Sequence, residues 1–178
     1  GDLARQKDTA TIILAENKHC APPLEELHGL REWRMGGFEG GLVTDLWIPL
    51  FREHSLDDSG IAGGFKALER MIGLQGIADA IAGRDPSRTA EDFNSIAERT
   101  HGAIDHIAAT TLAGGGGNAL AVTSGMTIRS IMKLYVPDVQ GVLRVPNCSL
   151  TILRYADGKF ALLQSADVGY CALADESP

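Results

Sequence analysis

The strongest constraint on the fold lies between residues 89 and 113, where mostly apolar residues recur at intervals of three and four. This is the spacing of one face of an α-helix. Thr89 is expected to cap the helix, and Asp92, three residues later, to complete a variant of the capping box. Such a face is stable only when another element covers it, so the segment predicts a core built around a long helix. The face consists of Phe93, Ile96, Ala97, Thr100, Ala103, Ile104, Ile107 and Ala108.

Composition sets the broad class of the protein. The chain has 178 residues, of which 44% are hydrophobic, which suffices for a single domain over residues 1–178. Its net charge of −7 argues against a nucleic-acid partner and against an anionic membrane surface. No apolar run approaches the roughly 18 residues that span a bilayer. Cys20, Cys148 and Cys171 are odd in number and far apart, which favours a reducing, cytoplasmic location over a disulfide framework.

Further helices are expected on both sides of this segment. The first runs from near Asp2 to Ala15, with apolar residues such as Ile13 on a buried face, and Pro22-Pro23 ends it. Extended chain is expected over residues 24–30. A second helix covers residues 43–52. Residues 57–60 have the composition of a loop, and an extension of that loop over residues 61–64 stays open. A broken helix is expected over residues 65–82 because Gly73 and Gly76 interrupt it, and the last helix runs from Gly125 to Pro137.

Two segments have the pattern of strands. Residues 118–123 are short, apolar and bounded by turn residues, which predicts a central parallel strand. Residues 149–155 and 160–164 alternate around Asp157-Gly158, which predicts a hairpin. Helices mixed with parallel and antiparallel strands indicate an α/β domain.

Three stretches together resemble the histidine phosphatases, the phosphoglycerate-mutase-like family. They are residues 1–10 (GDLARQKDTA), 30–40 (LREWRMGGFEG) and 118–129 (NALAVTSGMTIR), which occur in the family's order and spacing. The resemblance implies a three-layer sheet with helices on both faces. It also implies phosphomonoester hydrolysis or phosphoryl transfer through a phosphohistidine.

Carried over residue by residue, the resemblance assigns four positions. Arg5 matches an arginine that binds phosphate, and Glu32 matches the acid that protonates the leaving alcohol. Ser124 occupies the place of the family's second histidine, and Gly125 opens a helix whose free N–H groups would face the phosphate. Serine donates a hydrogen bond but supplies no positive charge, which by analogy with a lost donor costs about 3 kcal/mol of transition-state stabilisation.

The nucleophilic histidine has no match. No Arg-His-Gly occurs in the sequence, and neither His28-Gly29 nor His101-Gly102 follows a predicted strand. On this interpretation the chain corresponds to the C-terminal three quarters of a family domain, without the nucleophile strand, and is inactive alone. The alternative is a non-catalytic pseudo-enzyme that binds phosphate or phosphoesters. A sheet edge left open by that strand would favour pairing with another copy in a homo-oligomer.

The remaining expectations concern ligands. The predicted partner is a small phosphorylated substrate or phosphate ion, and neither the composition nor the resemblance implies a cofactor. His101 and His106 are five residues apart on one helix and point in different directions, which argues against a metal site. Glu39 is expected to cap or pair within its own glycine-rich turn.

Overall fold

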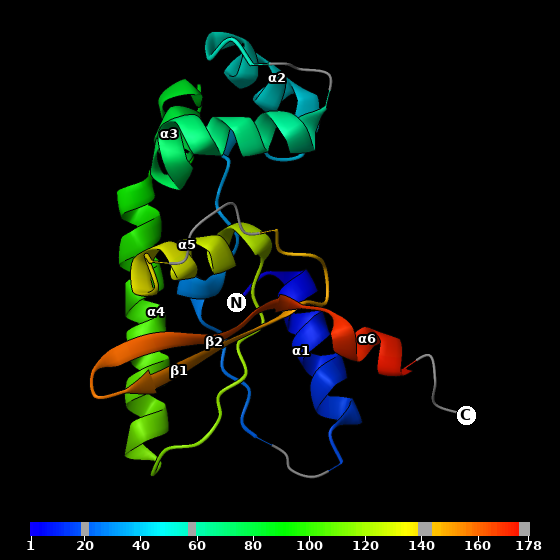
Figure 1. The fold of residues 1–178 in the computed structure, drawn as a ribbon, viewed down its shortest axis with the longest axis vertical. Helices are drawn as coiled ribbons and strands as arrows, with labels where there is room; N and C mark the ends of the chain where they lie inside the picture. Colours follow the sequence, from blue (N-terminus) through cyan, green and yellow to red (C-terminus); the bar gives the residue numbers. More distant parts are fainter. Residues whose placement is uncertain (19–21, 57–59, 139–143, 175–178) are drawn as a thin grey trace. The chain divides into compact units, whose positions relative to one another are not determined.

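The computed structural model of the chain describes residues 1–18, 22–56, 60–138 and 144–174, with side chains up to residue 171 (Figure 1). It divides into two compact units, which are taken in turn. The first comprises residues 1–32 and 99–178, and the second comprises residues 33–98. In the described part of the chain, no helix combines the length and apolar character that crossing a membrane requires.

The first unit is a helical layer with a hairpin. Its core joins Leu30 to Ala103 and Ile104 of the long helix and to Ile131 of the following helix. This is the apolar face predicted from the sequence, covered as expected. The elements are α1 (Ala4–Glu16), η1 (His28–Leu30), most of α4 (Phe93–Ala113), α5 (Gly125–Tyr135), β1 (Leu150–Ala156), β2 (Lys159–Asp167) and α6 (Gly169–Ala174).

The hairpin of β1 and β2 is antiparallel and turns at Asp157-Gly158, as predicted. Both turn residues have positive φ, 51° and 74°, the conformation that an Asp-Gly turn supplies. Phe160 packs against the core, and its ring lies 4.6 Å from that of Tyr135 in α5. The α/β class and the C-terminal hairpin are therefore confirmed.

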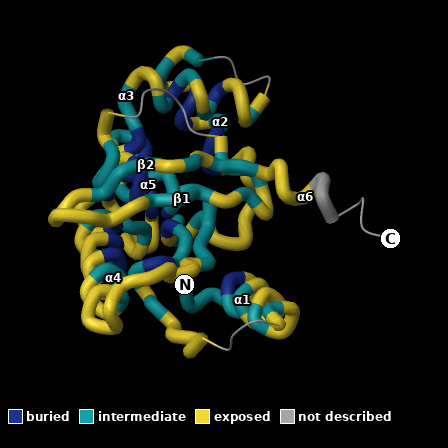
Figure 2. The backbone as a smooth tube through the Cα atoms, turned by 60° about the horizontal axis from the view of Figure 1, so that its bottom comes forward, coloured by how far each residue is buried: buried dark blue, intermediate teal, exposed yellow. Residues whose placement is uncertain are grey.

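Helix α1 forms where it was expected, but its predicted apolar face is wrong. Ile13 is 40% exposed, whereas the one buried residue of the helix is the polar Gln6, 2% exposed. Most of α1 accordingly has the colours of exposed and intermediate residues in Figure 2. The helix is held by the hydrogen bonds of a buried amide and not by a stripe of apolar contacts.

The strand predicted over residues 118–123 is also wrong. The segment has no regular secondary structure, and Leu120 is 64% exposed. The only sheet among the described residues is the two-stranded hairpin, so this apolar segment has no ladder to join. Instead, two hydrogen bonds hold the C-terminal end of the segment. The backbone nitrogen of Gly1 donates to the Val122 carbonyl at 2.7 Å, and Thr123 Oγ1 donates to the Leu30 carbonyl at 2.6 Å.

The second unit packs two helices around aromatic side chains. Trp47 and Phe51 of α2 (Val43–Glu53) stack, and Trp47 meets Phe65 of α3 (Ile61–Arg84) edge-on. Helix α3 starts at Ile61, so residues 61–64 belong to the helix and do not extend the predicted loop, of which residues 57–59 lie outside the described residues. It is broken at Gly73, whose φ of 69° and ψ of 173° lie outside the helical region, as the sequence indicated.

A buried carboxylate organises the rest of the second unit. Asp85 is 4% exposed and accepts backbone N–H bonds from Gly37 (2.9 Å), Thr89 (2.6 Å) and Ala90 (2.7 Å). Ser87 adds a hydroxyl and a backbone donor. These bonds fix η2 (Gly36–Phe38) and the approach to α4.

The N-terminus of α4 differs from the prediction, because Asp92 and not Thr89 caps it. Its carboxylate accepts the N–H of Ser95 at 2.8 Å, and Asp79 accepts that of Phe93 at 2.9 Å. The hydroxyl of Thr89 instead bonds Ser87. Glu39 accepts the N–H of Met35 at 2.8 Å, so its expected role within its own turn is confirmed.

We predict that Asp85→Asn lowers the unfolding midpoint at neutral pH. Burial raises the pKa of Asp85, but the bonds from Ala90, Gly37 and Ser87 outweigh it and hold the pKa well below the ordinary 3.8. The charged form therefore stabilises the fold above pH 3.8, and this stabilisation is lost as the pH falls below that value. Denaturant unfolding at pH 7 and at pH 3 measures it.

The matched control is Glu98→Gln, which neutralises an exposed carboxylate of α4. The wild type and Glu98→Gln should lose stability together on acidification, whereas Asp85→Asn should lose less. A parallel loss in all three proteins would contradict the role of Asp85.

Candidate functional site

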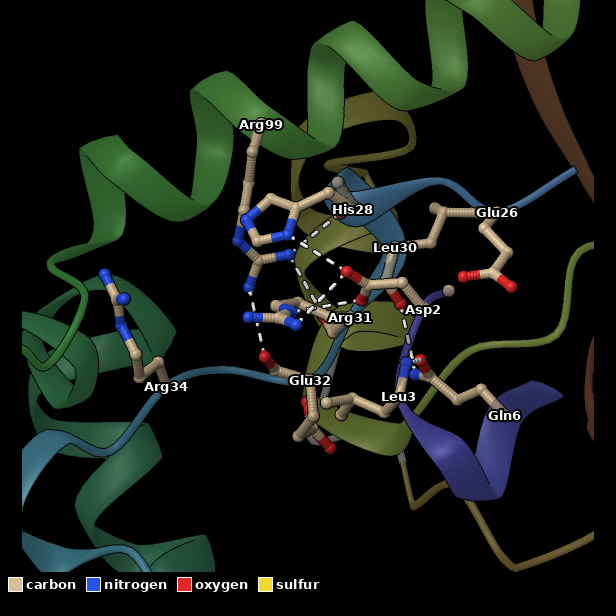
Figure 3. A network of polar contacts seen from close by, with 12 residues as sticks. Asp2, Leu3, Gln6, Glu26, His28, Leu30, Arg31, Glu32, Arg34 and Arg99 are labelled. Carbon is tan, nitrogen blue, oxygen red and sulfur yellow. Dashed lines mark hydrogen bonds and ion pairs between the residues drawn. The ribbon is translucent and has the colours of Figure 1, made fainter. Parts of the chain in front are cut away.

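The candidate site is built on the segment from Gly29 to Glu32, whose backbone carbonyls are bonded by side chains from three helices (Figure 3). Arg99 of α4 donates to the carbonyls of Gly29 (2.8 Å), Arg31 (3.0 Å) and Glu32 (3.4 Å). Gln6 of α1 donates to the Leu30 carbonyl at 3.2 Å. Side-chain donors, and not the ladder of a sheet, therefore fix the backbone that carries Glu32.

Glu32 lies at the N-terminus of α5. Its carboxylate accepts the backbone N–H groups of Met126 and Thr127, each at 3.2 Å. Thr127 Oγ1 donates to the Arg31 carbonyl at 2.6 Å, which ties the two segments together. An anion is favoured here because the N–H groups of the first turn are free of helical partners and the dipole is positive. The carboxylate of Glu32 is therefore bound at the start of α5.

Ser124 immediately precedes α5 and is its N-cap residue. Its backbone is extended, but its hydroxyl makes no capping bond. Serine usually accepts an N–H of the first turn at this position. Here the carboxylate of Glu32 holds those N–H groups, and Ser124 Oγ instead accepts a bond from Gln6 Nε2 at 2.9 Å. Glu32, Ser124 and Gly125 thus come together at one helix end.

Arg5 is not brought into this group. It lies in the first turn of α1, and its residue is exposed. Among the described residues its guanidinium makes no hydrogen bond or ion pair, and its carbonyl accepts Thr9 Oγ1 at 2.8 Å. The motif placed the arginine at a helix start as expected. The adjacent Gln6, and not Arg5, contacts Ser124.

A second cluster borders the same segment. The carboxylate of Asp2 accepts hydrogen bonds from Nε and Nη2 of Arg31, each at 3.1 Å. It is also hydrogen-bonded to Nδ1 of His28 at 3.1 Å. Burial raises the pKa of Asp2, but its bonds to Arg31 and His28 outweigh this effect and lower it below the ordinary value. His28 is thus a surface partner of a carboxylate, with its side chain 64% exposed.

The other candidate histidines from the sequence bond to groups outside this site. His101 bonds the Tyr135 hydroxyl through Nδ1 at 2.9 Å, and His106 pairs with Glu25 at 2.9 Å. Within the described residues no group of three or more His, Cys, Asp or Glu side chains could hold a metal ion. Cys148 and Cys171 are exposed free thiols, and Cys20 lies outside the described residues.

Sequence reasoning missed Gln6, Thr127 and Arg99. A glutamine on a short helix has the composition of a solvated face, so Gln6 carries no signal of its own. Thr127 does carry one, because it is three residues after the N-cap, where side chains reach back to the preceding segment. Arg99 lies on the predicted long helix, but its targets are backbone carbonyls that only the fold brings near.

Comparison with known proteins now identifies the family. The sequence profile described as histidine phosphatase superfamily (branch 1) matches residues 75–168, more than half of the chain. The chain belongs to the histidine phosphatase superfamily. A search of curated proteins gives no significant match.

A solved crystal structure supports the same family assignment. The crystal structure of phosphoglycerate mutase from Bacillus anthracis str. Sterne is similar, with a TM-score of 0.85 and 27% sequence identity. The similarity covers 99% of this chain and 74% of that one. The family and the phosphoglycerate-mutase-like α/β fold are therefore confirmed. The expected three-layer sheet is not seen among the described residues, whose one sheet is the two-stranded hairpin. The roles assigned to Arg5, Glu32, Ser124 and Gly125 stay predictions.

We predict that Gly29→Ala destabilises this superfamily domain by about 1–3 kcal/mol, because it overpacks a fixed contact. A Cβ at Gly29 would lie 2.1 Å from the backbone oxygen of Arg99 and 2.7 Å from Ala103 Cβ. The backbone of α4 cannot yield as a flexible side chain would. Unfolding by denaturant measures the change in free energy.

Gly102→Ala is the matched control. Gly102 lies inside α4, and a methyl group added there would meet no described atom outside the helix backbone within 4 Å. Alanine should therefore raise stability by roughly 0.5–1 kcal/mol through helix propensity. Equal destabilisation by both substitutions would show that the close approach at Gly29 is unimportant.

Proposed function

We propose that this chain is a phosphoester-binding domain of the phosphoglycerate-mutase-like type, and that its 178 residues do not catalyse phosphoryl transfer by themselves. The observation that carries the proposal is the carboxylate of Glu32 on the N–H groups of Met126 and Thr127, beside Ser124. The helix end that would receive a phosphoryl oxygen holds an internal anion. The adjacent side chain is a neutral hydroxyl in place of an imidazolium.

Charge explains why turnover is not expected. A phosphomonoester carries about two negative charges, and its transfer depends on positioning and on neutralising them. Ser124 contributes a hydrogen bond but no charge, and the covalent step needs a nucleophile that no Arg-His-Gly in this sequence supplies. Arg5, the positive group that the resemblance assigns to the pocket, is exposed and lies outside the group formed by Glu32, Ser124 and Gly125.

The second candidate is an enzyme, a phosphatase or mutase that works through a phosphohistidine. It is favoured by the carboxylate of Glu32, which the resemblance assigns as the acid, at the start of α5 and by the similarity to a phosphoglycerate mutase. An in-frame Arg-His-Gly segment encoded ahead of Gly1 would support this candidate. A start codon adjoining Asp2 would support the binding protein.

The partners follow from the same chemistry. We propose a small phosphorylated ligand or phosphate ion and a cytoplasmic location. The segment of residues 118–123 has no regular secondary structure and leaves Leu120 64% exposed, and we propose that this exposed apolar side chain favours association into a homo-oligomer. We propose no nucleic-acid partner, because the net charge of −7 is unfavourable for one.

We predict that the purified 178-residue chain hydrolyses 4-nitrophenyl phosphate no faster than a buffer control. The reason is the lack of a nucleophile for the covalent step. Release of 4-nitrophenolate is measured for the wild type and for Arg5→Ala. Turnover well above background in the wild type that disappears in Arg5→Ala would overturn the proposal.

We also predict weak binding of inorganic phosphate, in the millimolar range, because few charged groups contact it. Glu32→Gln should tighten binding by about tenfold, since it removes a negative charge close to the same N–H donors. Arg5→Ala should weaken it, and Lys18→Ala, an exposed cation beyond the end of α1, should not. Calorimetric titration of the four proteins measures these affinities. Equal affinity of wild type and Arg5→Ala would contradict the predicted pocket.

A further inference from the structure

Gln6 is a buried polar side chain that borders the site. It is 2% exposed, and each end of its amide is bonded. Oε1 accepts the backbone N–H of Leu3 at 3.2 Å. Nε2 donates to the Leu30 carbonyl at 3.2 Å and to Ser124 Oγ at 2.9 Å. Figure 3 shows the amide between the start of α1 and Leu30.

Two of these partners fix the orientation of the amide. A backbone N–H can only donate and a backbone carbonyl can only accept, so the oxygen must face Leu3 and the nitrogen must face Leu30. An amide turned the other way would place two donors together at Leu3 and two acceptors together at Leu30. The nitrogen therefore also faces Ser124, and it can only donate there.

The polarity of the Ser124 hydroxyl follows. Its oxygen accepts from Gln6, so its hydrogen must point to another group. The oxygen accepts no second hydrogen bond from α5, because Ser124 makes no capping bond and Glu32 holds the N–H groups of Met126 and Thr127. In the described part of the chain the hydroxyl hydrogen has no acceptor.

We infer that Gln6 is a positioning residue, which makes the Ser124 hydroxyl a hydrogen-bond donor directed at a phosphoryl oxygen. The inference rests on the proposed phosphoester-binding function and names a residue beyond the positions assigned by the family resemblance. A serine without this partner could rotate its hydrogen away and present a lone pair of its oxygen to an anion. Gln6 opposes that arrangement by supplying a hydrogen that the oxygen accepts.

A structural role is the competing explanation. Gln6 also ties the first turn of α1 to Leu30, so a substitution could weaken phosphate binding by loosening that turn. The two explanations differ in one respect. Positioning acts through the Ser124 hydroxyl and disappears when that hydroxyl is removed, whereas loosening of α1 persists.

The experiment is a double-mutant cycle with inorganic phosphate as the probe. Gln6→Met retains the length of the side chain and removes its donors. It should weaken phosphate binding about three- to tenfold in the wild-type background, the value of one neutral hydrogen bond. In the Ser124→Ala background it should change the affinity by less than about 1.5-fold, because coupled residues are not additive.

Ser130→Ala provides the control background. Ser130 lies in α5 and its hydroxyl donates to the Met126 carbonyl at 3.0 Å, within the same helix. The effect of Gln6→Met should be the same with and without this change. Equal losses from Gln6→Met in the wild-type and Ser124→Ala backgrounds would overturn the positioning role, as would no loss in either.

A second readout separates this inference from the proposed function. The side-chain amide protons of Gln6 are followed by ¹⁵N-edited NMR without ligand, and Ser124→Ala should shift one of them. If that shift is present and no protein binds phosphate, the proposed function fails, and the phosphate role of Gln6 with it. If Ser124→Ala leaves both protons unchanged, the hydrogen bond is absent and the role of Gln6 alone is overturned.

Discussion

The first unit depends on one constraint, the hydrogen bonding of the backbone carbonyls between Gly29 and Glu32. A buried carbonyl without a partner is costly, and no strand of the described sheet pairs with this segment. Side chains supply the donors in place of a ladder: Arg99, Gln6, Thr123 and Thr127. They come from α4, from α1 and from the region where α5 begins, so the same bonds that satisfy the backbone also bring these elements together. Glu32 reaches the end of α5 because of this arrangement.

The arrangement gives the helix end an internal ligand. The N-terminus of α5 has an effective charge of roughly +0.5, and Glu32 more than balances it. An incoming phosphoryl group must therefore bind beside the carboxylate or displace it. Either route weakens binding relative to an open helix end, because like charges repel and the lost N–H bonds must be replaced.

Local physics explains which features could be predicted from the sequence. The face of α4, the break at Gly73 and the turn at Asp157-Gly158 follow from the spacing and backbone preferences of residues close in the chain. The prediction of a strand over residues 118–123 failed because apolar residues and flanking turn residues describe only one of the two strands that must pair in a sheet. The strands with which it would pair are formed by segments far away in the sequence. The candidate site shows the same division, since the motifs located Glu32 and Ser124, whereas only the fold reveals that Gln6 is buried and Arg5 exposed.

If Ser124 stands where the family has its second histidine, as we propose, the difference has consequences beyond one missing charge. An imidazole has two nitrogens on a rigid ring and acts as a donor to phosphate whenever it is protonated. A hydroxyl is a donor only if its rotation is constrained, because its oxygen can equally serve as an acceptor. Gln6 provides that constraint through an amide whose own orientation is set by two backbone groups. The direction of one hydrogen is thus determined by residues far apart in the chain. Under the proposed function, a neutral donor beside Glu32 would hold a phosphoryl group weakly and release it unchanged.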